Sequence, residues 1–147
     1  MFNIVTKDSA VKFFGELTLP SSIIIDDFKE EFHLPITYWS LIDYKKSWYN
    51  ALKEGLHKKN HAALAVSMYD PISVNFIFIW IIYFEGEDVF LQNQTLFIED
   101  CQNFSPSKLN DFIDPRYTET ENGDRVSEWS TDINSILEFY KELENSI

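Results

Sequence analysis

The feature that most restricts the fold of this chain is a run of nine consecutive apolar residues, from Phe76 to Phe84. A membrane-spanning helix needs about 20 such residues, so this run is too short to cross a bilayer. Its isoleucine-rich and aromatic composition is typical of a strand, and the lack of alternation indicates that both faces of that strand are covered. We therefore predict a central β-strand over residues 74–84.

Turn residues follow this run directly, in the sequence Glu85-Gly86-Glu87-Asp88. A second β-rich stretch then extends from Val89 to Ile98, and two such stretches joined by four turn residues indicate an antiparallel hairpin. A further strand is expected before the run, from His61 to Met68. Asp70-Pro71 then forces a turn after this strand. These strands are expected to form the centre of the fold.

The first 60 residues predict two strands and one helix. Val11 to Leu19 alternates in part and indicates a strand that Pro20 ends, and Ile23 to Ile25 indicates a second, shorter strand. Residues 26–35 are polar and irregular, which favours a loop. Residues 43–59 predict an amphipathic helix, because apolar side chains recur at three- and four-residue spacing after an acidic N-cap.

The predicted elements after Cys101 are short. Ser105-Pro106 is typical of a helix start and predicts a short helix through Ile113. Asn122-Gly123 indicates a two-residue turn whose flanks alternate only weakly. A last helix is expected from about Asp132. This order of elements predicts one α+β domain over residues 1–147, with a mostly antiparallel, twisted sheet and about three helices.

Charge is distributed unevenly along the chain. The sequence has 24 acidic and 12 basic residues, a net charge of −12, and residues 85–147 hold fifteen acids against four bases, a net of −11. The acids are mixed with apolar residues, which indicates a face of folded elements and not a disordered tail. This face either keeps the protein soluble or docks a strongly basic partner, and it repels nucleic acids and anionic membranes. The lysines within residues 43–59 are interpreted as an ordinary solvated helix face.

Residue types that support catalysis or metal binding occur without the spacing that such sites need. His57 and His61 lie four residues apart but lack a third ligand, so the sequence predicts no metal site. Cys101 has no neighbouring base and no second cysteine, and we expect a structural thiol. With four glycines and no phosphate-binding motif, the chain is expected to be neither an enzyme nor a cofactor-binding protein. No secretory signal is present, which predicts a cytoplasmic protein.

Four segments carry a resemblance to a known family: Phe32–Trp39, Asp43–Trp48, His61–Tyr69 and Ser127–Asp132. They resemble the immunity proteins of contact-dependent growth inhibition systems, the CdiI proteins, and the resemblance extends from about Pro20 to the C-terminal helix. The branch that this chain resembles has a Whirly-like fold and protects against the C-terminal toxin domain of a CdiA surface protein, a nuclease that cleaves 16S ribosomal RNA. The resemblance implies a protein that neutralises its cognate CdiA toxin by blocking substrate access.

A nuclease that grips RNA has a basic surface, so its inhibitor gains from an acidic one. We expect this interface to comprise Tyr117 and Trp129 as aromatic anchors and a charged rim of Glu119, Glu121, Asp124, Glu128 and Asp132. For each of these residues, the alternative is an ordinary surface or core position. Two other functions stay open: a Whirly-like module that binds single-stranded nucleic acid, which a charge of −12 disfavours, and a small hydrolase, for which no catalytic constellation is found.

Overall fold

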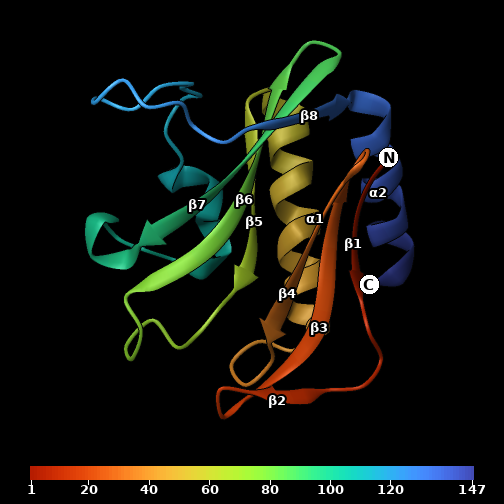
Figure 1. Ribbon diagram of the computed structural model, residues 1–147, viewed down its shortest axis with the longest axis vertical. Helices are drawn as coiled ribbons and strands as arrows, with labels where there is room; N and C mark the ends of the chain where they lie inside the picture. The colour runs from red at the N-terminus through yellow and green to blue at the C-terminus, as the bar shows by residue number, and fades with distance from the viewer.

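The computed structural model describes all 147 residues and contains two four-stranded antiparallel sheets (Figure 1). Sheet A consists of β1 (Phe2–Thr6), β2 (Val11–Phe13), β3 (Glu16–Ile25) and β4 (Phe28–Pro35). Sheet B consists of β5 (His61–Ser67), β6 (Phe76–Glu85), β7 (Asp88–Phe97) and β8 (Trp129–Asp132), in that order. The helices are α1 (Leu41–Lys58) and α2 (Ile133–Ser146), with the 3-10 segments η1 (Ile98–Asp100) and η2 (Pro106–Phe112). The predicted α+β class with antiparallel strands is confirmed, although the strands form two sheets and not one.

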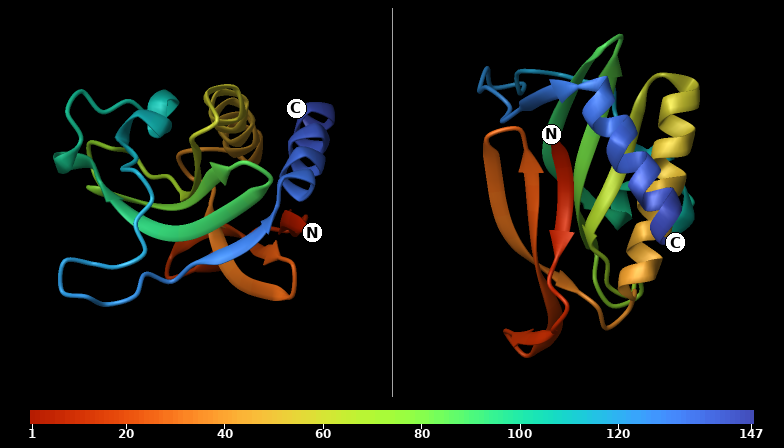
Figure 2. Two further views of the ribbon diagram at one scale, coloured as in Figure 1. Left: turned by 90° about the horizontal axis from the view of Figure 1, so that it is seen from above. Right: turned by 90° about the vertical axis from the view of Figure 1, so that its right-hand side faces the viewer.

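The elements lie in layers, with sheet B between sheet A and helix α1, while helix α2 lies beside α1 and reaches sheet A (Figure 2). Helix α1 runs along β5, where the indole Nε1 of Trp48 donates a hydrogen bond of 2.8 Å to the carbonyl of Ala65. Gly55 allows this close approach, because a Cβ at that position would collide with the carbonyl oxygen of His61. Helix α2 packs against α1 and β1. Helix α1 thus covers one side of sheet B, and α2 joins α1 to sheet A.

Strand β6 is the central strand that the apolar run predicts. It pairs with β5 on one side and with β7 on the other, and its residues from Ile79 to Phe84 are buried. The predicted hairpin is also confirmed, since Glu85 and Asp88 are register partners around the turn. One residue of the run departs from the prediction: Phe78 is 49% exposed.

Two predictions for sheet A are wrong. Residues 26–35 are not a loop, since Phe28 to Pro35 forms β4 and pairs along its length with β3. Pro20 does not end a strand but lies inside β3, between the pairs Thr6↔Ser21 and Val11↔Thr18. Its carbonyl accepts the N–H of Lys7, so the missing N–H of this proline faces the gap between β1 and β2 and costs no ladder bond.

The C-terminal third contains less regular structure than the sequence indicates. Around Asn122-Gly123 the chain forms one isolated bridge, between Glu119 and Arg125, instead of two extended flanks. The expected helix after Ser105 is a 3-10 segment, with a non-helical backbone at Lys108. The start of the last helix is confirmed, with Asp132 at the N-cap of α2.

Candidate partner-binding surface

All seven residues of the predicted interface lie in the acidic segment, which we define as residues 116–132. Its central part is a loop held by three backbone hydrogen bonds. Thr120 N–H donates to Asp124 O at 2.8 Å, Gly123 N–H to Thr120 O at 2.9 Å and Val126 N–H to Thr118 O at 2.9 Å. Exposed residues on this loop include Tyr117 and three carboxylates, those of Glu119, Glu121 and Asp124. None of the three carboxylates takes part in an ion pair of the protein. Their charge is therefore free for a partner.

The carboxylate of Glu128, in contrast, is bound within the protein. Arg116 grips it with two hydrogen bonds, Nε to Oε2 at 2.9 Å and Nη2 to Oε1 at 2.6 Å, and the amide of Gln92 donates to it at 2.7 Å. The Arg116 bonds, together with the one from Gln92, hold the pKa of Glu128 below its usual value. The guanidinium also lies over the ring of Phe90, 3.8 Å from its centre. This cluster fastens the acidic segment to sheet B.

The last two predicted residues also have contacts inside the fold. Trp129 is half-buried, with its ring centre 4.6 Å from that of Phe28 in sheet A and 5.2 Å from that of Trp80 in sheet B. Asp132 accepts the backbone N–H of Ser135 at 2.8 Å and so caps α2. The structure thus gives Glu128, Trp129 and Asp132 contacts inside the fold, and a partner role for any of the seven residues remains a prediction.

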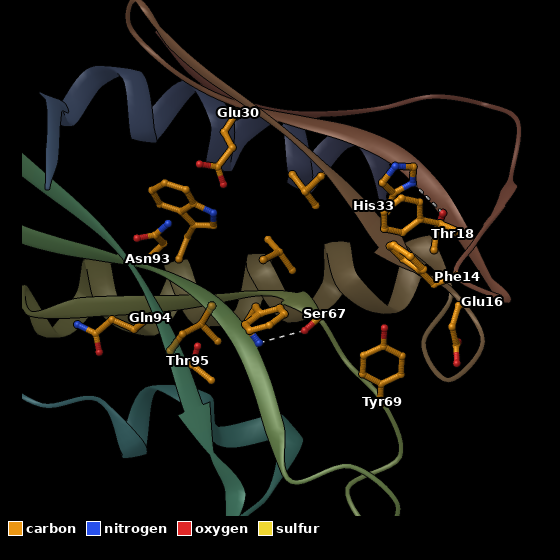
Figure 3. A pocket seen from close by; sticks show the side chains of 16 residues that line it. Phe14, Glu16, Thr18, Glu30, His33, Ser67, Tyr69, Asn93, Gln94 and Thr95 are labelled. Atoms are coloured by element: carbon orange, nitrogen blue, oxygen red, sulfur yellow. Dashed lines mark hydrogen bonds between the residues drawn. The ribbon is translucent and has the colours of Figure 1, made fainter. Parts of the chain in front are cut away.

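A second candidate surface lies between the two sheets, which we call the intersheet cleft (Figure 3). The cleft has a volume of about 620 Å³. Its sheet B wall is built from two register pairs, Phe78↔Thr95 and Trp80↔Asn93, whose members share one face. Its sheet A wall consists of Glu16, Thr18, Glu30, Phe32 and His33.

The β2–β3 turn forms one rim of the cleft and exposes an aromatic side chain. Phe14 is 91% exposed and has a φ of +50°, followed by Gly15 at +79°. Beside it, Phe13 stacks on His33 with 3.8 Å between ring centres, and His33 Nδ1 lies 3.1 Å from the hydroxyl of Thr18. Two-residue hairpin turns with positive φ favour glycine and asparagine, so a bulky Phe14 is an unusual choice here.

The cleft is negatively charged. Glu16 and Glu30 line it, whereas no lysine or arginine does. Burial raises the pKa of Tyr69, and the nearby carboxylate of Glu16 raises it further. Sequence reasoning missed this surface because its lining residues extend from Phe13 to Thr95 in the chain. One signal was available: Glu30 occurs between Phe28 and Phe32 at two-residue spacing, where a strand would place all three on one face.

Side chains with catalytic chemistry have partners inside the fold. His61 Nε2 lies 2.8 Å from the carbonyl oxygen of Asn110, and the thiol of Cys101 donates to the carbonyl of Phe97 at 3.4 Å. Burial raises the pKa of Cys101, which keeps the thiol protonated. No group of three or more His, Cys, Asp or Glu side chains is arranged to hold a metal ion. The helices include none that is both long and apolar enough to cross a membrane.

Comparisons with known proteins agree with the resemblance. The CdiI N-terminal domain family matches residues 34–139. The immunity protein CdiI of Enterobacter cloacae subsp. cloacae is 52% identical over 145 residues, which cover 99% of this chain and 100% of that protein. A chain of the solved CdiA-CT/CdiI toxin and immunity complex from Enterobacter cloacae matches with a TM-score of 0.95 and 52% identity, over 99% of both chains. This chain therefore belongs to the CdiI family of immunity proteins.

Proposed function

We propose that this protein binds the C-terminal toxin domain of a cognate CdiA protein and neutralises it in the cytoplasm. The observation that carries this proposal is the 52% identity, over 99% of both chains, to a chain of a toxin and immunity complex. A TM-score of 0.95 means that the two chains share nearly the same backbone, which supports a shared way of binding a partner.

The charge of the chain supports a nuclease as the toxin. A domain that cleaves ribosomal RNA has to attract phosphates, so it offers a basic surface. This protein has a net charge of −12, and its acidic segment holds three carboxylates that no internal cation neutralises. The cognate toxin on this proposal is a basic nuclease of the kind that cuts 16S ribosomal RNA.

Neutralisation on this proposal works by blocking substrate access. An acidic protein on the RNA-binding face of a nuclease excludes the substrate both by its volume and by its charge. Glu119, Glu121 and Asp124 form the charged rim, and Tyr117 beside them is an aromatic anchor. Glu128, Trp129 and Asp132 contribute to the toxin interface through the parts of their side chains that the fold leaves accessible.

The protein itself catalyses no reaction on this proposal. The hydrogen bond that Cys101 donates, and the raised pKa of its thiol, disfavour a nucleophile. The ring nitrogen of His61 that faces the carbonyl of Asn110 has to carry its proton, so it is not free to act as a base. Inhibition then requires one immunity protein for each toxin molecule.

A direct experiment uses the toxin domain encoded beside this chain. Calorimetry with the two purified proteins should show saturable one-to-one binding, and addition of the immunity protein should stop cleavage of 16S RNA in isolated ribosomes at equimolar ratio. The complex should also fail to co-sediment with 30S subunits, whereas a catalytically inactive toxin alone should co-sediment. Absence of binding contradicts the proposal, and a complex that still binds 30S subunits contradicts the blocking mechanism.

A further inference from the structure

We propose that the intersheet cleft is the main toxin-docking surface, and that its occupant is an arginine- or lysine-bearing segment of the basic toxin domain. This inference rests on the proposed function and adds to it the part of the molecule that provides tight binding.

The first observation is the position of Glu30. Strand alternation places it on the same face of β4 as Phe28 and Phe32, and its carboxylate points into the cleft (Figure 3). It forms no ion pair with any cation of the protein. A carboxylate among aromatic rings, without an internal partner, is suited to a cation that comes from outside.

The second observation is Phe14 at the rim. A non-glycine residue in the left-handed region costs about 1–3 kcal/mol, and a phenylalanine that is 91% exposed gains almost no burial in return. Its ring meets that of Phe13 edge-on, with 4.5 Å between ring centres, and this single contact leaves the side chain almost fully exposed. An aromatic anchor that is buried only when a partner binds explains this exposed ring.

The combination of aromatic faces with carboxylates fits the guanidinium group of arginine in particular, because that group stacks on rings and pairs with oxygens at once. The same chain already shows this chemistry internally, where Arg116 lies over Phe90 and pairs with Glu128. The cleft offers the same two elements, with the exposed rings of Phe14 and Phe78 and the carboxylates of Glu16 and Glu30. Its volume of about 620 Å³ falls within the usual range of ligand pockets, about 300–1,000 Å³.

The charge of the cleft disfavours single-stranded nucleic acid as the occupant. Such ligands need aromatic platforms together with basic side chains that follow the phosphates. The cleft has the platforms, but its charged lining residues are Glu16 and Glu30. A positively charged protein segment is attracted by both the aromatic rings and the carboxylates, whereas a nucleic acid is repelled by the carboxylates.

The test compares two cleft variants with matched controls, using the purified full-length protein and its cognate toxin domain. Glu30→Gln removes the charge and keeps the shape, and its control is Glu31→Gln on the opposite face of the same strand. Phe14→Asn removes the ring and supplies a residue that suits the turn, and its control is Leu137→Ala, at an exposed apolar position on α2.

We expect Phe14→Asn to weaken toxin binding by about 30-fold or more and Glu30→Gln by about 10-fold. Both controls should stay within about twofold of the original affinity. The melting temperature of Phe14→Asn should be unchanged or higher, since asparagine tolerates the left-handed conformation. Weaker binding by a variant that is at least as stable cannot come from misfolding.

Three results would overturn the inference. If the original protein binds toxin and both cleft variants bind equally well, the toxin docks elsewhere, although the proposed function stands. If a thymidine oligonucleotide binds the cleft and displaces toxin, or if sedimentation shows a dimer that Phe14→Asn dissociates, the cleft has another occupant. If the original protein does not bind toxin at all, the proposed function itself fails.

Discussion

The intersheet cleft and the acidic segment are both negative, but they are built in different ways. The walls of the cleft are strands of two sheets, and one of its side chains, Trp80, is only 2% exposed. The acidic segment is mainly a loop, whose free carboxylates are exposed and whose tip is held by few backbone bonds. The first surface is shaped by paired strands, whereas the second is a loop that presents exposed, unpaired charges.

This difference indicates a division of tasks in toxin recognition. Buried aromatic contacts on a rigid frame mainly slow dissociation, whereas exposed charges mainly accelerate association. An inhibitor of a nuclease needs both, because every free toxin molecule can act many times. We therefore expect changes in the cleft to alter dissociation and changes in the acidic segment to alter association.

The largest expected effect is on the free energy of unfolding, and it is tested by replacing one aromatic residue from each surface. Trp80→Ala should lower the free energy of unfolding by about 3–5 kcal/mol, since it removes a buried ring where the sheets meet. Tyr117→Ala should change it by less than about 0.5 kcal/mol, since the side chain is 42% exposed. Urea denaturation measures both. Similar losses for the two variants would show that the segment is as much a part of the core as the cleft.

The next effect concerns the cluster that fastens the acidic segment. Arg116→Ala should destabilise the protein by about 1–3 kcal/mol, because it leaves the half-buried carboxylate of Glu128 without its main partner. The matched control is Arg125→Ala, which removes an exposed arginine that forms no ion pair. Equal stability of both variants would contradict a structural role for the cluster.

The same cluster of Arg116 and Glu128 makes the stability of the fold fall as the pH becomes acidic. Arg116 holds the pKa of Glu128 below its usual value of 4.5, so the carboxylate stabilises the fold above about pH 4.5. That contribution is lost as the pH falls through the lower pKa of the folded state. Accordingly, the stability difference between the original protein and Glu128→Gln should be constant near neutral pH and shrink in acid. A difference that grows in acid would refute this assignment.

A smaller effect, on rate, is expected from the free carboxylates of the acidic segment. Changing Glu119, Glu121 and Asp124 together to lysine should slow toxin association about 10-fold at low salt and flatten its salt dependence, with little change in dissociation. The control changes three glutamates of α2 to lysine, Glu138, Glu142 and Glu144, and so alters the net charge equally. Stopped-flow kinetics should show the smaller effect for the control. Equal slowing would mean that only the total charge matters.

The smallest expected effect separates capping from binding at Asp132. Asp132→Ala should cost about 1 kcal/mol of stability, whereas Asp132→Ser keeps an N-cap oxygen and should cost less than about 0.5 kcal/mol. Thermal denaturation measures both. If Asp132→Ser also leaves toxin affinity unchanged, this residue is a cap alone and leaves the set of interface candidates.

Sequence patterns predicted the elements whose signals are local. The apolar run ending at Phe84 and the turn after it defined the β6–β7 hairpin, and regular spacing defined α1. Strand β4 escaped prediction because Glu30 interrupts the apolar face between Phe28 and Phe32. A charged residue at this position can be explained only once the opposite wall of the cleft is known. That wall comes from residues more than 35 positions later.

The acidic segment shows the same limit in another form. The sequence correctly located exposed acids at Glu119, Glu121 and Asp124. It did not separate them from Glu128, whose charge is neutralised by Arg116. Composition records how many carboxylates a segment has, but only the fold decides which of them are already paired.

Hydrogen exchange of the protein, alone and with its cognate toxin domain, tests the central claim most directly. The account predicts that toxin slows exchange in the β2–β3 turn, in β4 and in the acidic segment, while the exposed, lysine-bearing face of α1 exchanges as before. Protection confined to α1, with the cleft and the free carboxylates unaffected, would contradict it.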